Sequence, residues 1–190
     1  MIGAEKLRAG MAIRYQGQPY KVVAADYHPG QGKMGGANHL ELRNLETGTL
    51  WQQSLRAELK VEELPIERLN LEYLYSTETA SIFMHLQNFE QIEVPSALLG
   101  AQARFLSEGM QLPVEFVEGR PIAVLFPDFV EIAVAETAPP VHSQVDGNWK
   151  PARLGNGVEV MVPPFVKSGE SIRLNLNTLK YMERARARAI

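Results

Sequence analysis

One lysine stands among four glycines in the stretch HPGQGKMGGAN, residues 28–38. Glycine-rich loops with a lysine often cradle phosphates, because backbone N–H groups can approach the anion and the amine adds positive charge. The Walker spacing is absent, since Lys33 is followed by Met34 rather than Ser or Thr. No helix is predicted after the loop on which a dinucleotide could rest. The lysine itself is therefore the group whose role needs an explanation.

Residues suited to catalysis are sparse elsewhere in the chain. The four histidines, which are His28, His39, His85 and His142, include no His-x-x-x-His pair for a metal. The chain has no cysteine and no Gly-x-Ser-x-Gly nucleophile elbow. An exposed glycine-rich loop gives no desolvation that would lower the pKa of a lysine nucleophile. His28 and His39 flank the loop, where they can meet across a hairpin, although polar residues at strand ends are equally ordinary. An enzyme is not expected.

Composition indicates a globular protein with an uneven charge distribution. The 190 residues are 45% hydrophobic and carry a formal net charge of −3. Residues 65–128 hold three basic against nine acidic side chains, whereas the segments before and after are close to neutral. Such segregation suits a modular chain in which only some faces meet a polyanion. Without cysteines, an apolar leader or a membrane-length run, we expect a cytosolic monomer that does not associate with membranes.

The loop is positioned by strands. Short alternating segments separated by Gly and Pro turns predict an all-β protein built from small barrels. The boundaries near Pro65 and Pro127 predict three modules, at residues 1–64, 65–128 and 129–190. One helix is expected, beginning at Ser96 as N-cap and closed by Gly109. The strands on either side make residues 28–38 a projecting hairpin loop, for which a merely flexible surface loop is the alternative.

Several longer segments resemble the elongation factor P family, relatives of the hypusine-bearing initiation factor 5A of archaea and eukaryotes. The opening LRAGMAIRYQGQPYKVV and the later LRNLETGT, LEYLYS and FMHLQNFEQIEV resemble successive family segments. The most specific stretch is KPARLGNGVEVMVPPFVKSG. It matches the family pattern at Lys150, Ala152, Gly157, Val160, Val162-Pro163, Val166 and Gly169.

This resemblance implies a fold and a function. The fold is an SH3-like, KOW-type N-terminal barrel followed by two OB barrels, in an L-shaped arrangement similar to tRNA. The implied function is that of a translation elongation factor. Such a factor binds the ribosome between the peptidyl and exit sites, beside peptidyl-tRNA, and stimulates peptide bond formation at consecutive prolines. It does so by orienting the tRNA, without making a covalent bond itself.

The resemblance also implies that the tip lysine reaches the peptidyl-transferase centre. Counting back from Thr47-Gly48-Thr49 assigns the tip to Lys33, whereas reading Pro29-Gly30 as the family's Pro-Gly would assign it to Gln31. We prefer Lys33, because a mobile cation suits an RNA-lined centre. The rest of the tip loop is Pro29, Gly30, Gly32, Met34, Gly35 and Gly36. No free cofactor is expected, but a lysine-modifying enzyme would be a partner if Lys33 carries the family's covalent extension.

Two departures point to a divergent, elongation factor P-like paralogue. The family's Gly-Asp-Thr loop, thought to sense the exit-site codon, is replaced by VHSQVDGNWKPA. The last strand reads NLNTLKYMERA, which keeps Tyr181 but loses the family's acidic, arginine and glycine positions. Discrimination of the exit-site codon is therefore in question.

Candidate RNA contacts lie in the first and third modules. Arg8, Lys21 and Arg43 are candidates for tRNA phosphates, and Lys150, Arg153 and the arginines of the C-terminal tail for the small subunit or the anticodon stem. The alternative function is a general RNA-binding OB protein that has lost stall rescue. Such grooves display exposed aromatics, whereas Phe129, Trp149, Phe165 and Tyr181 mostly fit core or strand positions, which weighs against this alternative.

Overall fold

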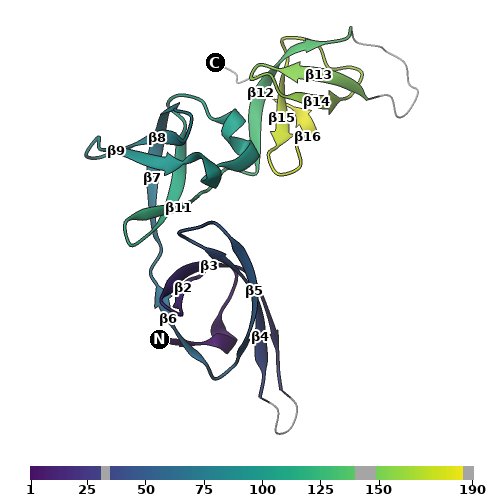
Figure 1. The fold of residues 1–190 in the computed structure, drawn as a ribbon. Helices are drawn as coiled ribbons and strands as arrows, with labels where there is room; N and C mark the ends of the chain where they lie inside the picture. Colours follow the sequence, from purple (N-terminus) through teal and green to yellow (C-terminus); the bar gives the residue numbers. More distant parts are fainter. Residues whose placement is uncertain (31–34, 140–148, 186–190) are drawn as a thin grey trace. The chain divides into compact units, whose positions relative to one another are not determined.

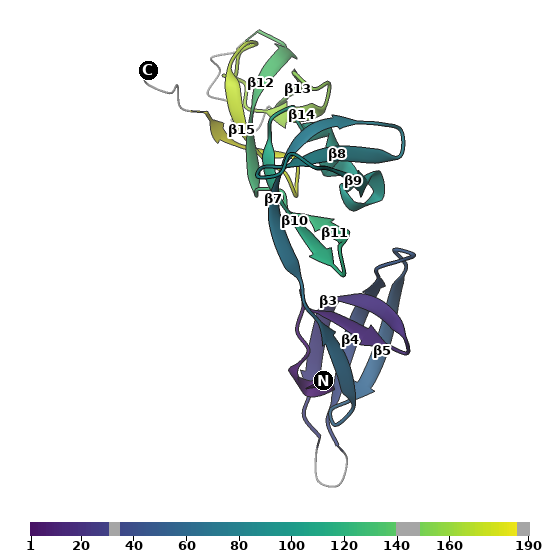
Figure 2. The same cartoon turned by 90° about the vertical axis from the view of Figure 1, so that its left-hand side faces the viewer.

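The computed structural model describes residues 1–30, 35–139 and 149–185. Three antiparallel sheets dominate it and no α-helix occurs in the described residues, which confirms the all-β prediction (Figures 1 and 2). The division into three modules with boundaries at 64/65 and 128/129 stays a prediction. By compactness the chain forms two units, residues 1–69 with 114–123, and residues 70–113 with 124–190.

The first sheet has six strands in the order β1-β6-β2-β3-β4-β5. Their bounds are β1 Ile2–Gly3, β2 Ala12–Tyr15, β3 Gln18–His28, β4 Ala37–Asn44, β5 Leu50–Arg56 and β6 Lys60–Leu64, with the 3₁₀ helix η1 Ala4–Lys6 after β1. Gln16 and Gly17 join β2 to β3 with φ of 50° and 78°. Positive φ at both central residues is typical of the two-residue type I′ turn, which makes β2 and β3 a tight hairpin. The barrel closes over Leu7, Ile13, Val22, Leu42 and other buried residues.

The second sheet has the order β11-β10-β7-β8-β9. Its strands are β7 Glu67–Ser76, β8 Ala80–His85, β9 Gln91–Pro95, β10 Gln111–Val117 and β11 Arg120–Val124. The two-residue alternation along β7 is interrupted, because the register with β8 shifts between Tyr73 and Tyr75. A bulge of this kind turns later side chains to the other face. Leu71 is accordingly buried, whereas Tyr75 is exposed.

The single helix predicted from Ser96 is wrong. Two short 3₁₀ helices occupy the segment, η2 Ser96–Leu98 and η3 Gly100–Phe105. Gly100, the first residue of η3, has a φ of +57°, which lies outside the right-handed helical region and prevents one continuous helix. Ser96 makes no capping side-chain hydrogen bond, and Leu106 already has an extended backbone, so Gly109 closes no helix.

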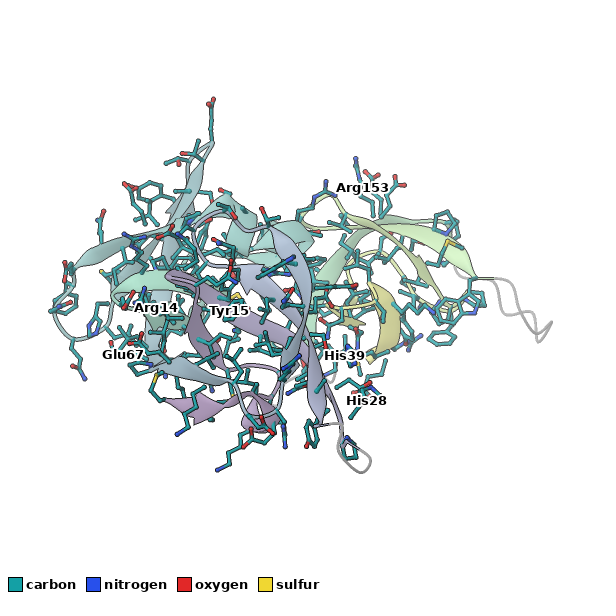
Figure 3. The ribbon with its side chains drawn as sticks, turned by 60° about the horizontal axis from the view of Figure 1, so that its bottom comes forward. Arg14, Tyr15, His28, His39, Glu67 and Arg153 are labelled. Atoms are coloured by element: carbon teal, nitrogen blue, oxygen red, sulfur yellow. The ribbon has the colours of Figure 1, made fainter. Side chains whose placement is uncertain are left out.

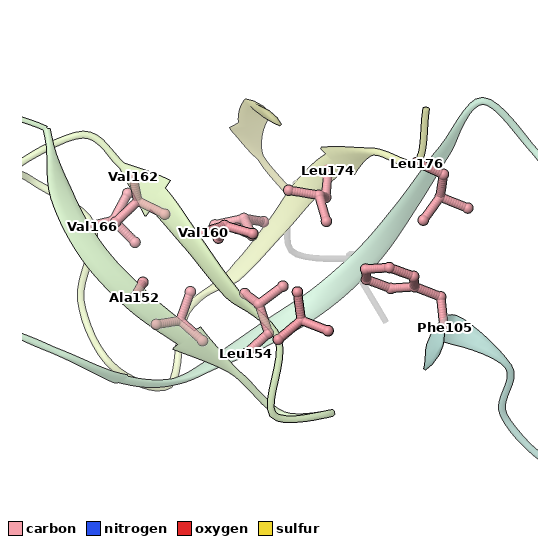
Figure 4. Packing of buried hydrophobic residues seen from close by; sticks show 11 residues of the cluster. Phe105, Ala152, Leu154, Val160, Val162, Val166, Leu174 and Leu176 are labelled. Atoms are coloured by element: carbon pink, nitrogen blue, oxygen red, sulfur yellow. The ribbon is translucent and has the colours of Figure 1, made fainter. Parts of the chain in front are cut away.

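The third sheet has the order β14-β13-β12-β15-β16. Its strands are β12 Phe129–Thr137, β13 Lys150–Leu154, β14 Glu159–Val162, β15 Ser171–Asn175 and β16 Lys180–Arg184. The buried core of this barrel also contains Phe105 from η3, beside Leu154 and Leu176 (Figure 4). Asn156 Nδ2 donates a hydrogen bond of 2.8 Å to the carbonyl oxygen of Arg104. The second compact unit therefore has a core shared between η3 and the third sheet.

Candidate functional site

The glycine-rich loop is carried by the long β3–β4 hairpin. Antiparallel pairing runs from Tyr20 and Asn44 to His28 and Ala37. The strands therefore include His28, Ala37 and Asn38, and the connecting loop is residues 29–36 rather than 28–38. Four of its residues, Gln31, Gly32, Lys33 and Met34, lie outside the described residues. Pro29, Gly30 and Gly35 are exposed and Gly36 is half-buried.

Gly36, where the chain re-enters the hairpin, lies in a tight space against Tyr27 and the His28 backbone. A Cβ at this position would lie 2.6 Å from Tyr27 Oη and 3.0 Å from the carbonyl oxygen of His28. The carbonyl oxygen of Gly36 accepts a hydrogen bond of 2.8 Å from the Ala57 backbone N–H. Close approach of backbone and ring explains why glycine is needed here.

Asn38 fastens the base of the same hairpin to the N-terminal segment. Its side chain is fully buried, and Nδ2 donates to the carbonyl oxygens of Ala4 and Leu7 at 2.8 and 3.2 Å. The Ala4 carbonyl, in η1, also accepts from the Leu7 backbone N–H at 3.2 Å, so Asn38 adds a second donor there and caps the Leu7 carbonyl after the end of η1. The role of Asn38 was not predicted from the sequence, where its only signal was a polar side chain at the inward position of an alternating strand.

His28 and His39 meet on the outer face of the hairpin, which confirms the expectation that they approach across it. Their ring centroids are 5.0 Å apart in an edge-to-face arrangement, and His28 Nε2 lies 2.9 Å from Asp26 Oδ2 (Figure 3). Both rings are exposed. Across the described ranges, no cluster of three or more histidine and carboxylate side chains is placed to hold a metal ion.

The predicted cations of the first barrel divide into two kinds. Arg8 and Arg43 are exposed. Lys21, in contrast, forms an ion pair with Glu115, whose side chain is only 7% exposed and also accepts from Arg68 at 2.8 Å. Burial acts to raise the pKa of Glu115, but the hydrogen bonds and charges of Lys21 and Arg68 outweigh it and hold that pKa below its ordinary value. Lys21 therefore neutralises a buried carboxylate.

In the third barrel, the ammonium group of Lys150 donates to the carbonyl oxygen of Ala138, and the residue is buried. Arg153 lies on the surface and pairs with Glu136 at 2.8 Å (Figure 3). Of these two predicted RNA contacts, only Arg153 presents its charge at the surface.

Of the four aromatic residues predicted to fit core or strand positions in the third barrel, Phe129 and Tyr181 do lie in strands, but none belongs to the fully buried core. Phe129, Trp149 and Phe165 are exposed, and Tyr181 is half-buried. Guanidinium groups cover two of the rings, with Arg173 4.3 Å from the centroid of Phe129 and Arg184 4.6 Å from that of Phe165. The alternation of β strands cannot by itself say which face of an open barrel is solvated.

A barrel with a glycine-rich hairpin is followed in the chain by two five-stranded β sheets, which defines a modular all-β protein. Three family models match in chain order. They are the elongation factor P KOW-like domain at residues 3–61, the OB domain at 66–124 and the C-terminal domain at 130–184. Among solved structures, the eukaryotic translation initiation factor 5A from Methanococcus jannaschii has a similar fold. Its TM-score is 0.50 at 18% identity, over 65% of this chain and 92% of that one.

The chain belongs to the elongation factor P family and is a translation elongation factor. It is 38% identical to elongation factor P of Ruegeria pomeroyi over 97% of this chain and 98% of that protein. It is 37% identical to the Brucella suis biovar 1 protein, over 97% of this chain and 99% of that one. The resemblance and the predicted fold are thereby confirmed. No helix in the described part of the chain is long and apolar enough to cross a membrane.

Proposed function

We propose that this chain binds the ribosome between the peptidyl and exit sites, beside peptidyl-tRNA, and speeds peptide bond formation at consecutive prolines. It works in the cytosol as a monomer and is not an enzyme, since it orients the reacting tRNA and makes no covalent bond with it. The observation that supports this proposal most directly is family membership over the whole length of the chain.

In this proposal Lys33 is the residue at the loop tip that reaches the peptidyl-transferase centre. It is assigned by counting back from Thr47-Gly48-Thr49 in the pattern of the family. The base of its loop is well suited to hold a working side chain, because Gly36 and Asn38 fix both the returning strand and the N-terminal segment. A lysine amine offers a compact, mobile charge to an RNA-lined centre. Covalent extension of Lys33 by a lysine-modifying enzyme is part of the proposal, and intact mass spectrometry of natively expressed protein measures it.

Arg8 and Arg43 remain the proposed contacts to tRNA phosphates, because both are exposed. Lys21 and Lys150 are not proposed as RNA contacts, since the ammonium group of Lys21 pairs with Glu115 and that of Lys150 donates to the carbonyl oxygen of Ala138. Arg153 is retained as a weaker candidate for the small subunit.

The decisive experiment measures translation of a triple-proline reporter with and without the protein. Stimulation by the unaltered chain and its loss in Lys33→Ala are expected. Lys60→Ala is the matched control, because Lys60 is an exposed lysine on β6, outside the tip loop in the chain. Absence of stimulation by the unaltered chain would refute the function. Full activity of Lys33→Ala would reject the tip assignment alone, and loss in Gln31→Ala would then support the other register.

A second candidate function is a general RNA-binding protein that no longer rescues stalled ribosomes. The exposed aromatics of the third barrel favour it, since single-stranded RNA is commonly bound by stacking on such rings. RNA binding without any stimulation of the triple-proline reporter would select this alternative.

A further inference from the structure

Three polar side chains gather on the outer face of the β3–β4 hairpin, at the end that carries the tip loop. In the antiparallel register Asp26 lies directly opposite His39, and His28 lies two residues further along the same face of β3. Diagonal neighbours of this kind are within reach of each other when their side chains are aromatic or long. The ring centroids of His28 and His39 are accordingly 5.0 Å apart (Figure 3). Strand pairing thus makes a histidine pair in a chain without a His-x-x-x-His motif.

The distance between the two rings suits a shared metal ion. With metal–nitrogen bonds of about 2.0–2.1 Å, two imidazoles that bind one ion at angles from a right angle to the tetrahedral angle have centroids about 4.5–5.2 Å apart. The observed 5.0 Å falls inside this range. The rings now meet edge to face, so one of them has to turn before both nitrogens point to one ion. Little opposes that turn, because the χ2 torsion of histidine is broad and both rings are exposed.

Asp26 holds His28 in the way that metal-binding histidines are usually held. Its Oδ2 lies 2.9 Å from Nε2 of His28. An ionised carboxylate can only accept a hydrogen bond, so in the neutral ring Nε2 carries the proton and Nδ1 keeps a free lone pair. Histidines that bind metals commonly donate their other ring N–H to a carboxylate, which fixes the tautomer and the ring orientation. The side chains of His28 and Asp26 are 61% and 77% exposed, so solvent and ions reach the pair.

The surrounding face is polar and favours a cation. A hollow of about 440 Å³ is lined by His39 together with Glu41, Ser54 and other residues of β3, β4 and β5. The carboxylate of Glu41, two residues from His39 on the same face, adds its charge to that of Asp26, whereas Arg56 on β5 brings one opposing charge. Among the residues whose structure is described, no group of three histidine and carboxylate side chains is placed to hold a metal ion. Water would therefore fill the coordination positions that the two imidazoles leave open.

The ligand chemistry selects the class of metal. Neutral imidazole suits Zn²⁺, Cu²⁺ and Ni²⁺, whereas Mg²⁺ and Ca²⁺ take oxygen ligands. We propose that His28 and His39 bind one late first-row divalent metal ion, with Asp26 as the residue that positions His28. The bound ion links β3 to β4 and stiffens the end of the hairpin next to the tip loop. This proposal does not depend on ribosome binding, so its failure would not count against the proposed function.

The test titrates the full chain, without a histidine tag, with ZnCl₂ in an isothermal titration calorimeter. His28→Gln and His39→Gln should each weaken Zn²⁺ binding at least as much as loss of an outer-shell partner does, which is about 10-fold or more. Asp26→Asn should weaken it about 10-fold for the same reason. His85→Gln is the matched control, because His85 ends β8 in the second compact unit. The control should bind Zn²⁺ like the unaltered chain, and MgCl₂ should give no binding that depends on His28 or His39.

Two further measurements use the variant that combines His28→Gln with His39→Gln. Electron paramagnetic resonance with one equivalent of CuCl₂ should show nitrogen coupling from two imidazoles in the unaltered chain, and this signal should be lost in the double variant. Zn²⁺ should raise the unfolding temperature of the unaltered chain only, since an ion that binds the folded state stabilises it. Equal affinity of the double variant and the unaltered chain for Zn²⁺ would overturn the proposal. So would equal binding of Mg²⁺ and Zn²⁺, which would assign the site to carboxylates.

Discussion

At the scale of single residues, the base of the tip loop depends on a contact between Gly36 and Tyr27. Gly36 needs no left-handed backbone; it is glycine because the Tyr27 ring occupies the place of a side chain. Gly35, its neighbour, meets only ordinary contact, with a Cβ placed 3.5 Å from Glu58 Oε1. Two adjacent glycines therefore tolerate substitution very differently.

Gly36→Ala should lower the free energy of unfolding by about 1–3 kcal/mol, because the added methyl forces the ring or the strand to shift. Gly35→Ala should change it by less than about 0.5 kcal/mol, as surface substitutions usually do. Urea denaturation of both variants measures the difference. Adding Tyr27→Phe to Gly36→Ala should restore part of the loss by removing the nearest atom. Equal effects of the two glycine variants would contradict this account.

The sequence predicted the hairpin that carries the loop, since glycines and strand flanks are local signals, whereas the role of Lys33 stays a prediction. Asn38 was missed because its partners, the carbonyl oxygens of Ala4 and Leu7, are distant in sequence. The role of Lys21 was missed for the same reason, since Glu115 follows it by 94 residues. The exposure of Trp149 was not predicted, because a strand's alternation does not say which barrel face is open.

At the scale of elements, part of the β10–β11 hairpin belongs to the first compact unit. Val117 and Ile122 pack with Ala12 and Leu64 in one buried cluster. Around it, Arg14 pairs with Glu118, and Glu115 is held by Lys21 and Arg68. The boundary at residue 64 follows the turn signal at Pro65, but no local signal could indicate that residues 114–123 return to this unit.

The buried Glu115 should make the first unit sensitive to acid. Its folded pKa is below the ordinary value of 4.5, so its stabilising contribution is complete above that pH and is lost as the pH falls below it. Glu115→Gln should therefore be less stable than the unaltered chain by about 1–3 kcal/mol at pH 7. The difference should shrink toward pH 3.

Urea denaturation at several pH values between 7 and 3 measures this dependence. Glu67→Gln is the matched control, because Glu67 is exposed and starts β7 in the same unit (Figure 3). The control should show no such convergence. A difference between Glu115→Gln and the unaltered chain that stays constant with pH would exclude the ion pairs as its cause.

At the scale of the whole molecule, three sheets form two compact units. The second unit combines η3 with the third barrel, where Phe105 is only 5% exposed and lies among Val134, Leu154 and Leu176. The sequence indicated three modules because each sheet has its own turn signals. It could not show that one side chain from a short 3₁₀ helix completes the core of the last barrel.

Two compact units with separate cores should unfold in two calorimetric transitions. Phe105→Ala removes a large buried ring and should cost about 3–5 kcal/mol, which lowers the temperature of one transition only. Lys21→Met should lower the other, because it leaves Glu115 with a single cationic partner. Phe89→Ala is the control within the second unit, since Phe89 is 69% exposed and its loss should leave both transitions in place. Movement of both transitions together in Phe105→Ala would show that the chain unfolds as one cooperative body instead.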